Sequence, residues 1–330
     1  MDGRGQCLSA IATLATPTSL FHVAWATLLG IVVGSLPGLT ATMGVALLTT
    51  LTYSLDRDAA ILTLICMYVG AIYGGSRSAI LLNIPGTPAS AATSLDGYPL
   101  ARQGKAGYAM GLAAAGSALG TLVGILLLVM IAPPLAEVAL KFGSFEFFWL
   151  AVFGIVISGQ LTGGVSPLKG YIAGILGLLV AMIGSDGIHA HVRFNLGISD
   201  LNGGIGLIPA MVGAFGFAEV LTVMWRRKAA LVSSSAGPDR TIPRALDLWR
   251  YKFTVARSGI VGTLIGIIPG VGEDIGAWAS YALAKRTSKE RDRFGKGSME
   301  GLTAAETGNS AVVPGALIPA LTLAVPGSAP

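Results

Sequence analysis

The sequence predicts an all-α, polytopic membrane protein with broken helices and re-entrant hairpins arranged as an inverted repeat. The first reason is composition: of 330 residues, 53% are hydrophobic and only 12% are charged, whereas soluble domains carry roughly 25% charged residues. With a mean hydropathy of +0.71, the chain has too few ionisable side chains to cover the surface of an ordinary soluble enzyme. The other two reasons are long apolar stretches and Pro-Gly breaks that recur in the same order.

Four stretches are predicted to be whole or nearly whole membrane spans: 107–132, 145–159, 168–184 and 205–225. A helix needs about 20 mostly apolar residues to cross a bilayer. Residues 110–120 are also rich in glycine and alanine, and small side chains let helices approach closely in lipid.

Two further apolar stretches, 19–54 and 258–284, are interrupted by the same pattern. Both carry G-x3-G-x2-P-G, which begins at Gly30 in one stretch and at Gly262 in the other, an offset of 232 residues. A second motif follows each: Ile84-Pro-Gly-Thr87 in the first half and Val325-Pro-Gly-Ser328 in the second. Two motifs in the same order indicate an internal duplication.

The duplication divides the chain into three parts. Residues 1–225 contain the first repeat with its connecting helices, 226–257 form a basic loop, and 258–330 begin the second repeat. The chain stops inside an apolar motif, so we expect the second copy to be incomplete.

Neutral polar side chains stand beside the four breaks. Proline removes a backbone donor and glycine relaxes the chain, so each Pro-Gly pair is predicted to open a helix inside the membrane. Broken helices at matching positions of two halves are typical of transporter binding sites, where half-helix N-termini attract anions and freed carbonyls bind cations. The alternative is that these polar groups only satisfy the opened backbone.

The predicted substrate- or ion-binding residues are Pro37, Gly38, Thr40, Arg77, Asn83, Pro85, Gly86, Thr87, Ser90, Pro269, Gly270, Gly272, Asn309, Ser310, Pro326, Gly327 and Ser328. We expect those from 83–90 to converge near mid-membrane with those from 309–328. No catalytic residue, metal ligand or cofactor is predicted.

Basic residues predict which side of the membrane two loops face. Residues 226–257 hold eight basic and two acidic side chains, and 285–296 hold six and two. Cytoplasmic loops carry such an excess, and without an aromatic stacking platform a nucleic-acid partner is not predicted. Residues 258–284 lie between the two loops and are too short for two crossings. They should therefore enter the membrane and return as a hairpin, and the first copy, which ends without a basic excess, should have the opposite sidedness.

Other function classes lack their motifs. The sequence contains no H-E-x-x-H, no G-x-S-x-G and no P-loop G-x4-G-K-[ST], which argues against an enzyme and against an ATP-driven pump. A passive anion channel or a membrane scaffold subunit remains the alternative to a carrier.

The residues resemble the large membrane subunit of tripartite tricarboxylate transporters, the TctA type, from about residue 21 to residue 330. The motifs that carry this resemblance include Tyr73-Gly-Gly-Ser76, Ala79-Ile-Leu-Leu-Asn-Ile-Pro-Gly-Thr-Pro88, Asp96-Gly-Tyr-Pro99, Ser166-Pro-Leu-Lys-Gly170, Ile268-Pro-Gly-Val-Gly272, Phe294-Gly-Lys-Gly297 and Glu306 with Asn309.

The resemblance implies a secondary carrier of the bacterial inner membrane. It would import citrate or related carboxylates, coupled to a cation that is Na+ or H+, with a small membrane subunit and an extracytoplasmic solute-binding protein. It also implies a longer subunit, so we expect this chain to be truncated at its C-terminus.

Arg77 departs from the family pattern, which has an uncharged residue there. An arginine near the membrane interior is expensive unless it faces protein, water or an anion. One interpretation is that its head reaches the interface. The other is that its planar guanidinium binds a substrate carboxylate through two hydrogen bonds.

Overall fold

The computed structural model describes residues 14–36, 39–139, 167–185, 191–205, 249–268 and 272–323, with short runs or single positions at 141, 143–146, 148–149, 152, 221, 224 and 328. Its helices are α2 (Pro17–Ser35), α3 (Ala41–Thr52), α4 (Arg57–Leu82), α5 (Ser90–Arg102), α6 (Ala106–Ala139), α8 (Pro167–Ala181), α12 (Lys252–Ile267), α13 (Gly272–Thr287) and α14 (Met299–Leu323). Two short 3-10 turns, η1 (Ser199–Gly203) and η3 (Arg291–Arg293), and a hairpin of β1 (Gly184–Ser185) with β2 (Val192–Arg193) complete the described elements.

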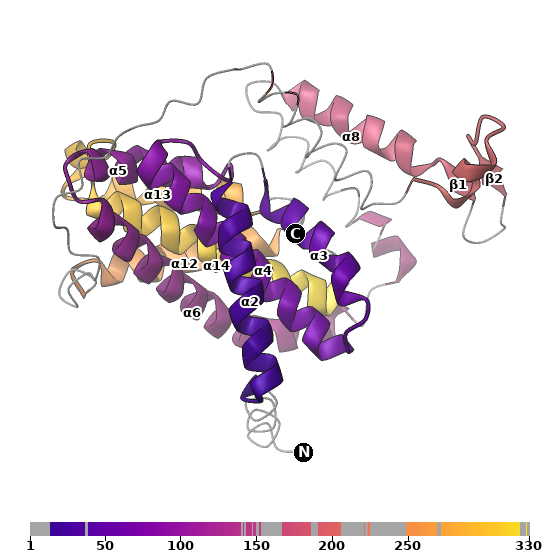
Figure 1. Ribbon diagram of the computed structural model, residues 1–330, viewed down its shortest axis with the longest axis horizontal. Helices are drawn as coiled ribbons and strands as arrows, with labels where there is room; N and C mark the ends of the chain where they lie inside the picture. Colours follow the sequence, from indigo (N-terminus) through magenta and orange to yellow (C-terminus); the bar gives the residue numbers. More distant parts are fainter. Residues whose placement is uncertain are drawn as a thin grey trace.

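The described helices pack as an all-α bundle, as the sequence predicts. Figure 1 shows α2 to α6 and α12 to α14 packed together, with α8 and the β hairpin to one side. The helix α14 lies at the centre and packs against α6, α12, α13 and α5. Its residues are buried without interruption from Gly301 to Ala316.

Among the described residues, three helices are long and apolar enough to cross a membrane: 17–35, 57–82 and 106–137. On α6, large apolar side chains such as Leu122, Leu126 and Val129 are exposed. These residues recur every three or four positions, so they form one outward stripe of the kind that faces lipid.

The predicted spans agree with the described helices to different degrees. Residues 107–132 lie within α6. The stretch 168–184 becomes α8, which ends earlier than predicted, at Ala181, and is followed by β1. Most of 145–159 and 205–225 lies outside the described residues.

The predicted breaks interrupt helices where the sequence places them. In the first copy α2 ends at Ser35 and α3 begins at Ala41, where the Thr40 side chain accepts a hydrogen bond from the backbone N–H of Met43. In the second copy α12 ends at Ile267 and α13 begins at Gly272.

The α12–α13 pair forms a helical hairpin, as predicted. A hydrogen bond joins Arg257, near the start of α12, to Thr287, at the end of α13. Just outside the two helices, Arg250 forms an ion pair with Glu290. Both arms therefore return to the same end of the bundle, the end that carries the basic residues. Its sidedness in the membrane stays a prediction.

Glycines join α2 to α4 backbone against backbone. A Cβ atom added at Gly30 would collide with the carbonyl oxygen of Met67, and one added at Gly34 would collide with that of Ala71. Small residues at such a contact let two helices approach closely. These two glycines belong to the repeated G-x3-G-x2-P-G pattern.

The second copy repeats this contact between α12 and α14. A Cβ atom at Gly262 would collide with the carbonyl oxygen of Gly308, and one at Gly266 would approach that of Val312 as closely. The partner residues in α14 follow those in α4 by 241 residues, which is also the offset between the prolines of the two later break motifs. The two helix pairs therefore share close backbone contacts at positions that the predicted duplication relates.

A single buried carboxylate fixes the start of α14. Asp96, in α5, accepts hydrogen bonds at one oxygen from the backbone N–H groups of Gly295, Gly297 and Ser298, at 2.7–2.9 Å. Its other oxygen accepts a 2.9 Å bond from the hydroxyl of Tyr281 in α13. Two sequence motifs that are about 200 residues apart thus meet at one side chain.

Candidate functional site

The break after α4 folds back onto the end of α2. Asn83 ends α4 in a left-handed conformation, with φ of 56°, which turns the chain out of the helix. A Cβ atom at the buried Gly86 would collide with the carbonyl oxygen of Gly34, so only glycine fits there. The two break motifs of the first copy therefore touch each other.

Thr87 and Ser90 form hydrogen bonds with each other at the start of α5. The hydroxyl of Ser90 accepts from the backbone N–H of Thr87 at 3.1 Å and donates to its carbonyl at 2.7 Å. The backbone N–H of Ser90 in turn donates to the Thr87 hydroxyl at 3.3 Å. Both side chains are buried, so the break places hydroxyl groups and a helix N-terminus in the interior.

In the second copy, a tyrosine from the first copy joins the two breaks. The hydroxyl of Tyr68, in α4, donates to Oε2 of Glu273 at 2.9 Å and lies 3.1 Å from Oγ of Ser328. Glu273 is at the N-terminus of α13, and Ser328 follows the later Pro-Gly pair. Ser328 also holds the motif position that Thr87 holds in the first copy.

The buried carboxylate of Glu306, in α14, is surrounded by hydroxyl groups from three other helices. Oε1 accepts hydrogen bonds from Ser76 of α4, at 2.7 Å, and from Thr93 of α5. Oε2 accepts one from Ser117 of α6 at 3.0 Å. No Lys, Arg or His side chain contacts this carboxylate within the part of the chain that the structure describes.

Asn309 lies one helical turn beyond Glu306 on α14. Its side chain is fully buried, and neither its Oδ1 nor its Nδ2 has a hydrogen-bond partner among the described residues. Ser310 is also buried. Burying a carboxamide without partners costs the free energy of its hydrogen bonds to water. The side-chain amide of Asn309 is therefore a buried polar group whose donors and acceptor are available to a ligand.

The structure brings part of the predicted site together. Pro37, Gly38, Pro269, Gly270, Pro326 and Gly327 lie outside the described residues. Of the others, Thr87 joins Ser90 and Ser328 joins Tyr68, and among described residues no hydrogen bond links either pair to Asn309 or Ser310. The predicted convergence of all these residues stays a prediction.

Three predicted residues lie away from the buried polar groups. Asn83 is exposed, Pro85 is half-buried and Arg77 is exposed on α4. The guanidinium of Arg77 lies over the ring of Tyr73, 5.1 Å from its centroid. This cation–π contact stabilises an exposed arginine without involving the break.

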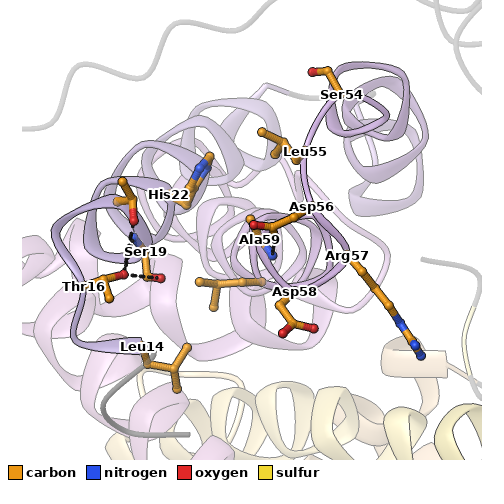
Figure 2. A pocket seen from close by; sticks show the side chains of 12 residues that line it. Leu14, Thr16, Ser19, His22, Ser54, Leu55, Asp56, Arg57, Asp58 and Ala59 are labelled. Carbon is orange, nitrogen blue, oxygen red and sulfur yellow. Dashed lines mark hydrogen bonds between the residues drawn. The ribbon is translucent and has the colours of Figure 1, made fainter.

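A large cavity of about 800 Å³ lies elsewhere, between the N-terminal ends of α2 and α4. Figure 2 shows His22, Asp56, Arg57 and Asp58 around it. Asp56 caps α4 by accepting from the backbone N–H of Ala59 at 2.8 Å. Because both breaks are at the opposite ends of these helices, this cavity is separate from the predicted site.

Sequence reasoning left five residues out of the site: Tyr68, Ser76, Thr93, Ser117 and Glu306. One signal was present, because a carboxylate within an apolar helix is rare and is usually functional. The hydroxyl groups carried no such signal, since serine and threonine are common in apolar helices. Among the described residues there is no group of three His, Cys, Asp or Glu side chains that could hold a metal ion.

Comparison with known proteins places this arrangement in a family. The family model described as "Tripartite tricarboxylate transporter TctA family" matches residues 20–330. An Agrobacterium vitis protein, "Uncharacterized 52.8 kDa protein in TAR-I ttuC' 3'region", is 37% identical over 321 residues, which cover 95% of this chain and 62% of that protein. A second Agrobacterium vitis protein, "Uncharacterized protein in TAR-II ttuC' 3'region", is 40% identical over 65 residues, covering 20% of this chain and 27% of that protein.

The chain thus spans less than two thirds of the length of the first of these relatives. No solved structure matches. The family match covers nearly the whole chain and the described helices are those of a multi-pass membrane protein. The chain belongs to the TctA family of tripartite tricarboxylate transporters.

Proposed function

We propose that the chain is part of the permease subunit of a cation-coupled secondary transporter that imports tricarboxylates or related organic acid anions across the bacterial inner membrane. TctA proteins work with a small membrane subunit and a solute-binding protein. In this proposal the binding protein delivers the anion to the permease, and a Na+ or H+ gradient drives its entry.

The observation that carries this proposal is the pair of hydroxyl groups at equivalent break positions. Thr87 and Ser328 occupy the same place in the two copies of one motif, and both are buried. Each accompanies the N-terminal end of a helix, at α5 and at α13. The positive end of a helix dipole, together with neutral hydroxyl groups, suits a carboxylate better than fixed positive charges would, because the anion must also leave.

Transport by the complete subunit tests the proposal. The subunit is reconstituted in proteoliposomes with its small membrane subunit, the binding protein is added outside, and uptake of labelled citrate is measured under an imposed cation gradient. We expect Thr87→Ala and Ser328→Ala each to weaken transport. The control is Thr50→Ala, which removes an exposed hydroxyl from α3 and should leave uptake unchanged.

Counterflow separates the proposed carrier from the two alternatives. Liposomes loaded with unlabelled citrate should transiently accumulate labelled citrate if the subunit is a carrier. A passive anion channel would give flux without accumulation, and a scaffold subunit would give no flux of its own.

A further inference from the structure

We propose that Glu306, Asn309 and the hydroxyl groups of Ser76, Thr93 and Ser117 form a Na+ site, and that this site couples cation entry to transport. The inference rests on the proposed function, because it assigns the coupling ion of that carrier and its ligands. It uses polar groups of α14, α4, α5 and α6 that lie beside the breaks.

An ionised Glu306 requires a partner for its charge. The three hydroxyl groups lie within hydrogen-bond distance of its two oxygens, and an ionised carboxylate, an acceptor only, can accept from all three. Hydroxyl donors stabilise the anion but leave its charge in place, and an isolated charge is costly in a low-dielectric interior. A bound cation removes that cost, and the hydroxyl oxygens can turn their lone pairs toward it.

The open carboxamide of Asn309 points to a ligand at the same place. Residues three apart on a helix are neighbours, with Cβ atoms about 5–6 Å apart, so Asn309 lies beside Glu306 on α14. Val313, four residues further along the same face, belongs to an apolar cluster formed mainly by residues of α3 and α4, among them Tyr68 and Ile72. Asn309 therefore lies between two positions that both face α4, where its Oδ1 is free to bind an ion.

The set of ligands fits Na+ better than other cations. One carboxylate balances one positive charge, and the other donors are neutral oxygens, whereas protein Ca2+ sites typically use several carboxylates. A proton would occupy one oxygen of Glu306, whereas a metal ion can use the carboxylate, the hydroxyl oxygens and Oδ1 of Asn309 together. Buried carboxylates within membrane helices commonly mark ion pathways.

The position of the site explains how an ion could act on the substrate. Ser76 and Thr93 belong to the first copy, and Glu306 belongs to the second, so an ion bound among them joins both halves. Thr93 lies one helical turn from Ser90, which is hydrogen-bonded to Thr87 in the break. Occupancy by Na+ would therefore fix α5 and the break that we propose binds the anion.

Binding of radioactive 22Na+ to the purified complete subunit in detergent, without substrate, tests this inference. We expect saturable binding by the wild type, and Glu306→Gln should weaken it by about 100-fold. The matched control is Glu300→Gln on the same helix, because Glu300 also accepts bonds from two hydroxyl groups, those of Thr254 and Ser288. This control should bind like the wild type.

Milder variants keep the test valid if Glu306→Gln fails to fold. Ser117→Ala and Asn309→Ala each remove one neutral ligand and should weaken Na+ binding by about tenfold, while gel filtration shows a monodisperse subunit. Unchanged 22Na+ binding in both folded variants would overturn the site. Wild-type citrate uptake driven by a pH gradient, with no 22Na+ binding, would also overturn it and leave the proposed carrier intact. Saturable 22Na+ binding that needs Glu306, in a subunit that moves no tricarboxylate, would support the site and refute the carrier.

Discussion

The hydroxyl groups of Tyr68 and Ser328 lie 3.1 Å apart, although 260 residues separate them. Tyr68 also donates to Glu273 at 2.9 Å, so a side chain of the first repeat contacts a residue beside each of the two breaks in the second. Asn309 in α14 corresponds to Tyr68 in α4, because 241 residues also separate the matching positions of these two helices. Its carboxamide has no partner among the described residues, so the two copies differ at this point.

Removing the Tyr68 hydroxyl should weaken the contacts that hold Glu273 and Ser328 beside the two breaks of the second copy. We expect Tyr68→Phe to lower the free energy of unfolding by about 0.5–1.5 kcal/mol and to reduce citrate uptake. Thermal unfolding in detergent and proteoliposome uptake measure the two effects. The control is Tyr53→Phe, because Tyr53 is 92% exposed. If both variants behave like the wild type, the contact between Tyr68 and the break has no role.

A methyl group at Gly34 should disrupt the packing of α2 on α4. A Cβ atom there would collide with the carbonyl oxygen of Ala71, and rigid backbone on both sides cannot move away easily. We expect Gly34→Ala to lower the unfolding temperature and the yield of monodisperse protein.

The glycine control lies in another helix. Gly177, in α8, has open space around it, and alanine is a better helix former than glycine, so Gly177→Ala should leave the unfolding temperature equal or raised. Equal stability of Gly34→Ala and the wild type would contradict the close contact.

Asp96→Ala should destabilise the bundle severely. It removes the acceptor of three backbone N–H groups and of the Tyr281 hydroxyl, and each buried donor left unsatisfied costs about 1–3 kcal/mol. Asp96→Asn keeps an acceptor oxygen and should lose less. The control Asp292→Ala alters an exposed carboxylate in the neighbouring η3 turn and should unfold like the wild type. Equal unfolding temperatures for Asp96→Ala and this control would refute the anchoring role of Asp96.

Two substitutions at Arg77 decide between the two interpretations of this residue. Its guanidinium is exposed and lies over Tyr73, and lysine keeps both the charge and the ability to contact the ring. We therefore expect Arg77→Lys to retain the apparent affinity for citrate and Arg77→Gln to lose a little transport activity. A substrate-binding arginine would instead lose affinity in both variants, because lysine lacks the planar pair of donors.

Cysteine labelling tests the sidedness of the basic loops. In a background without Cys7 and Cys66, single cysteines at Ser234 and Ser288 should resist a membrane-impermeant thiol reagent in intact cells and react after lysis. Both positions adjoin runs of basic residues, which are retained on the cytoplasmic side. Labelling of either cysteine from outside would refute the predicted hairpin orientation.

Local signals in the sequence were sufficient to predict the breaks. Proline and glycine restrict or relax the backbone wherever they occur, so the ends of α2 and α12 could be placed from Gly34 and Gly266 with their following Pro-Gly pairs. The duplication followed from the order of those motifs.

Contacts between distant residues could not be predicted in the same way. Nothing local to Asp96 indicates that it accepts N–H groups from residues 295–298, and nothing near Ser117 indicates that it faces Glu306. Such pairs depend on how helices cross, and the crossing depends on contacts at several separate positions, such as the close approach of Gly120 in α6 to the carbonyl oxygen of Thr307 in α14. Arg77 shows the same limit: its proximity to Pro85 in sequence suggested a site residue, and its exposure on α4 with the guanidinium over Tyr73 could not be foreseen from that proximity. Its role stays a prediction.

The glycine contacts within each helix pair also restrict where the protein can deform. Where two backbones touch, a small slide would bring peptide groups into collision, so α2 with α4 and α12 with α14 should each move as one rigid body. Between the pairs, the links are side-chain contacts: the hydrogen bonds of Tyr68 and Glu306, and the apolar cluster that contains Val313 with residues of α4. Side chains can shift against one another more readily than touching backbones, so rocking of one rigid pair against the other is the motion that this architecture favours.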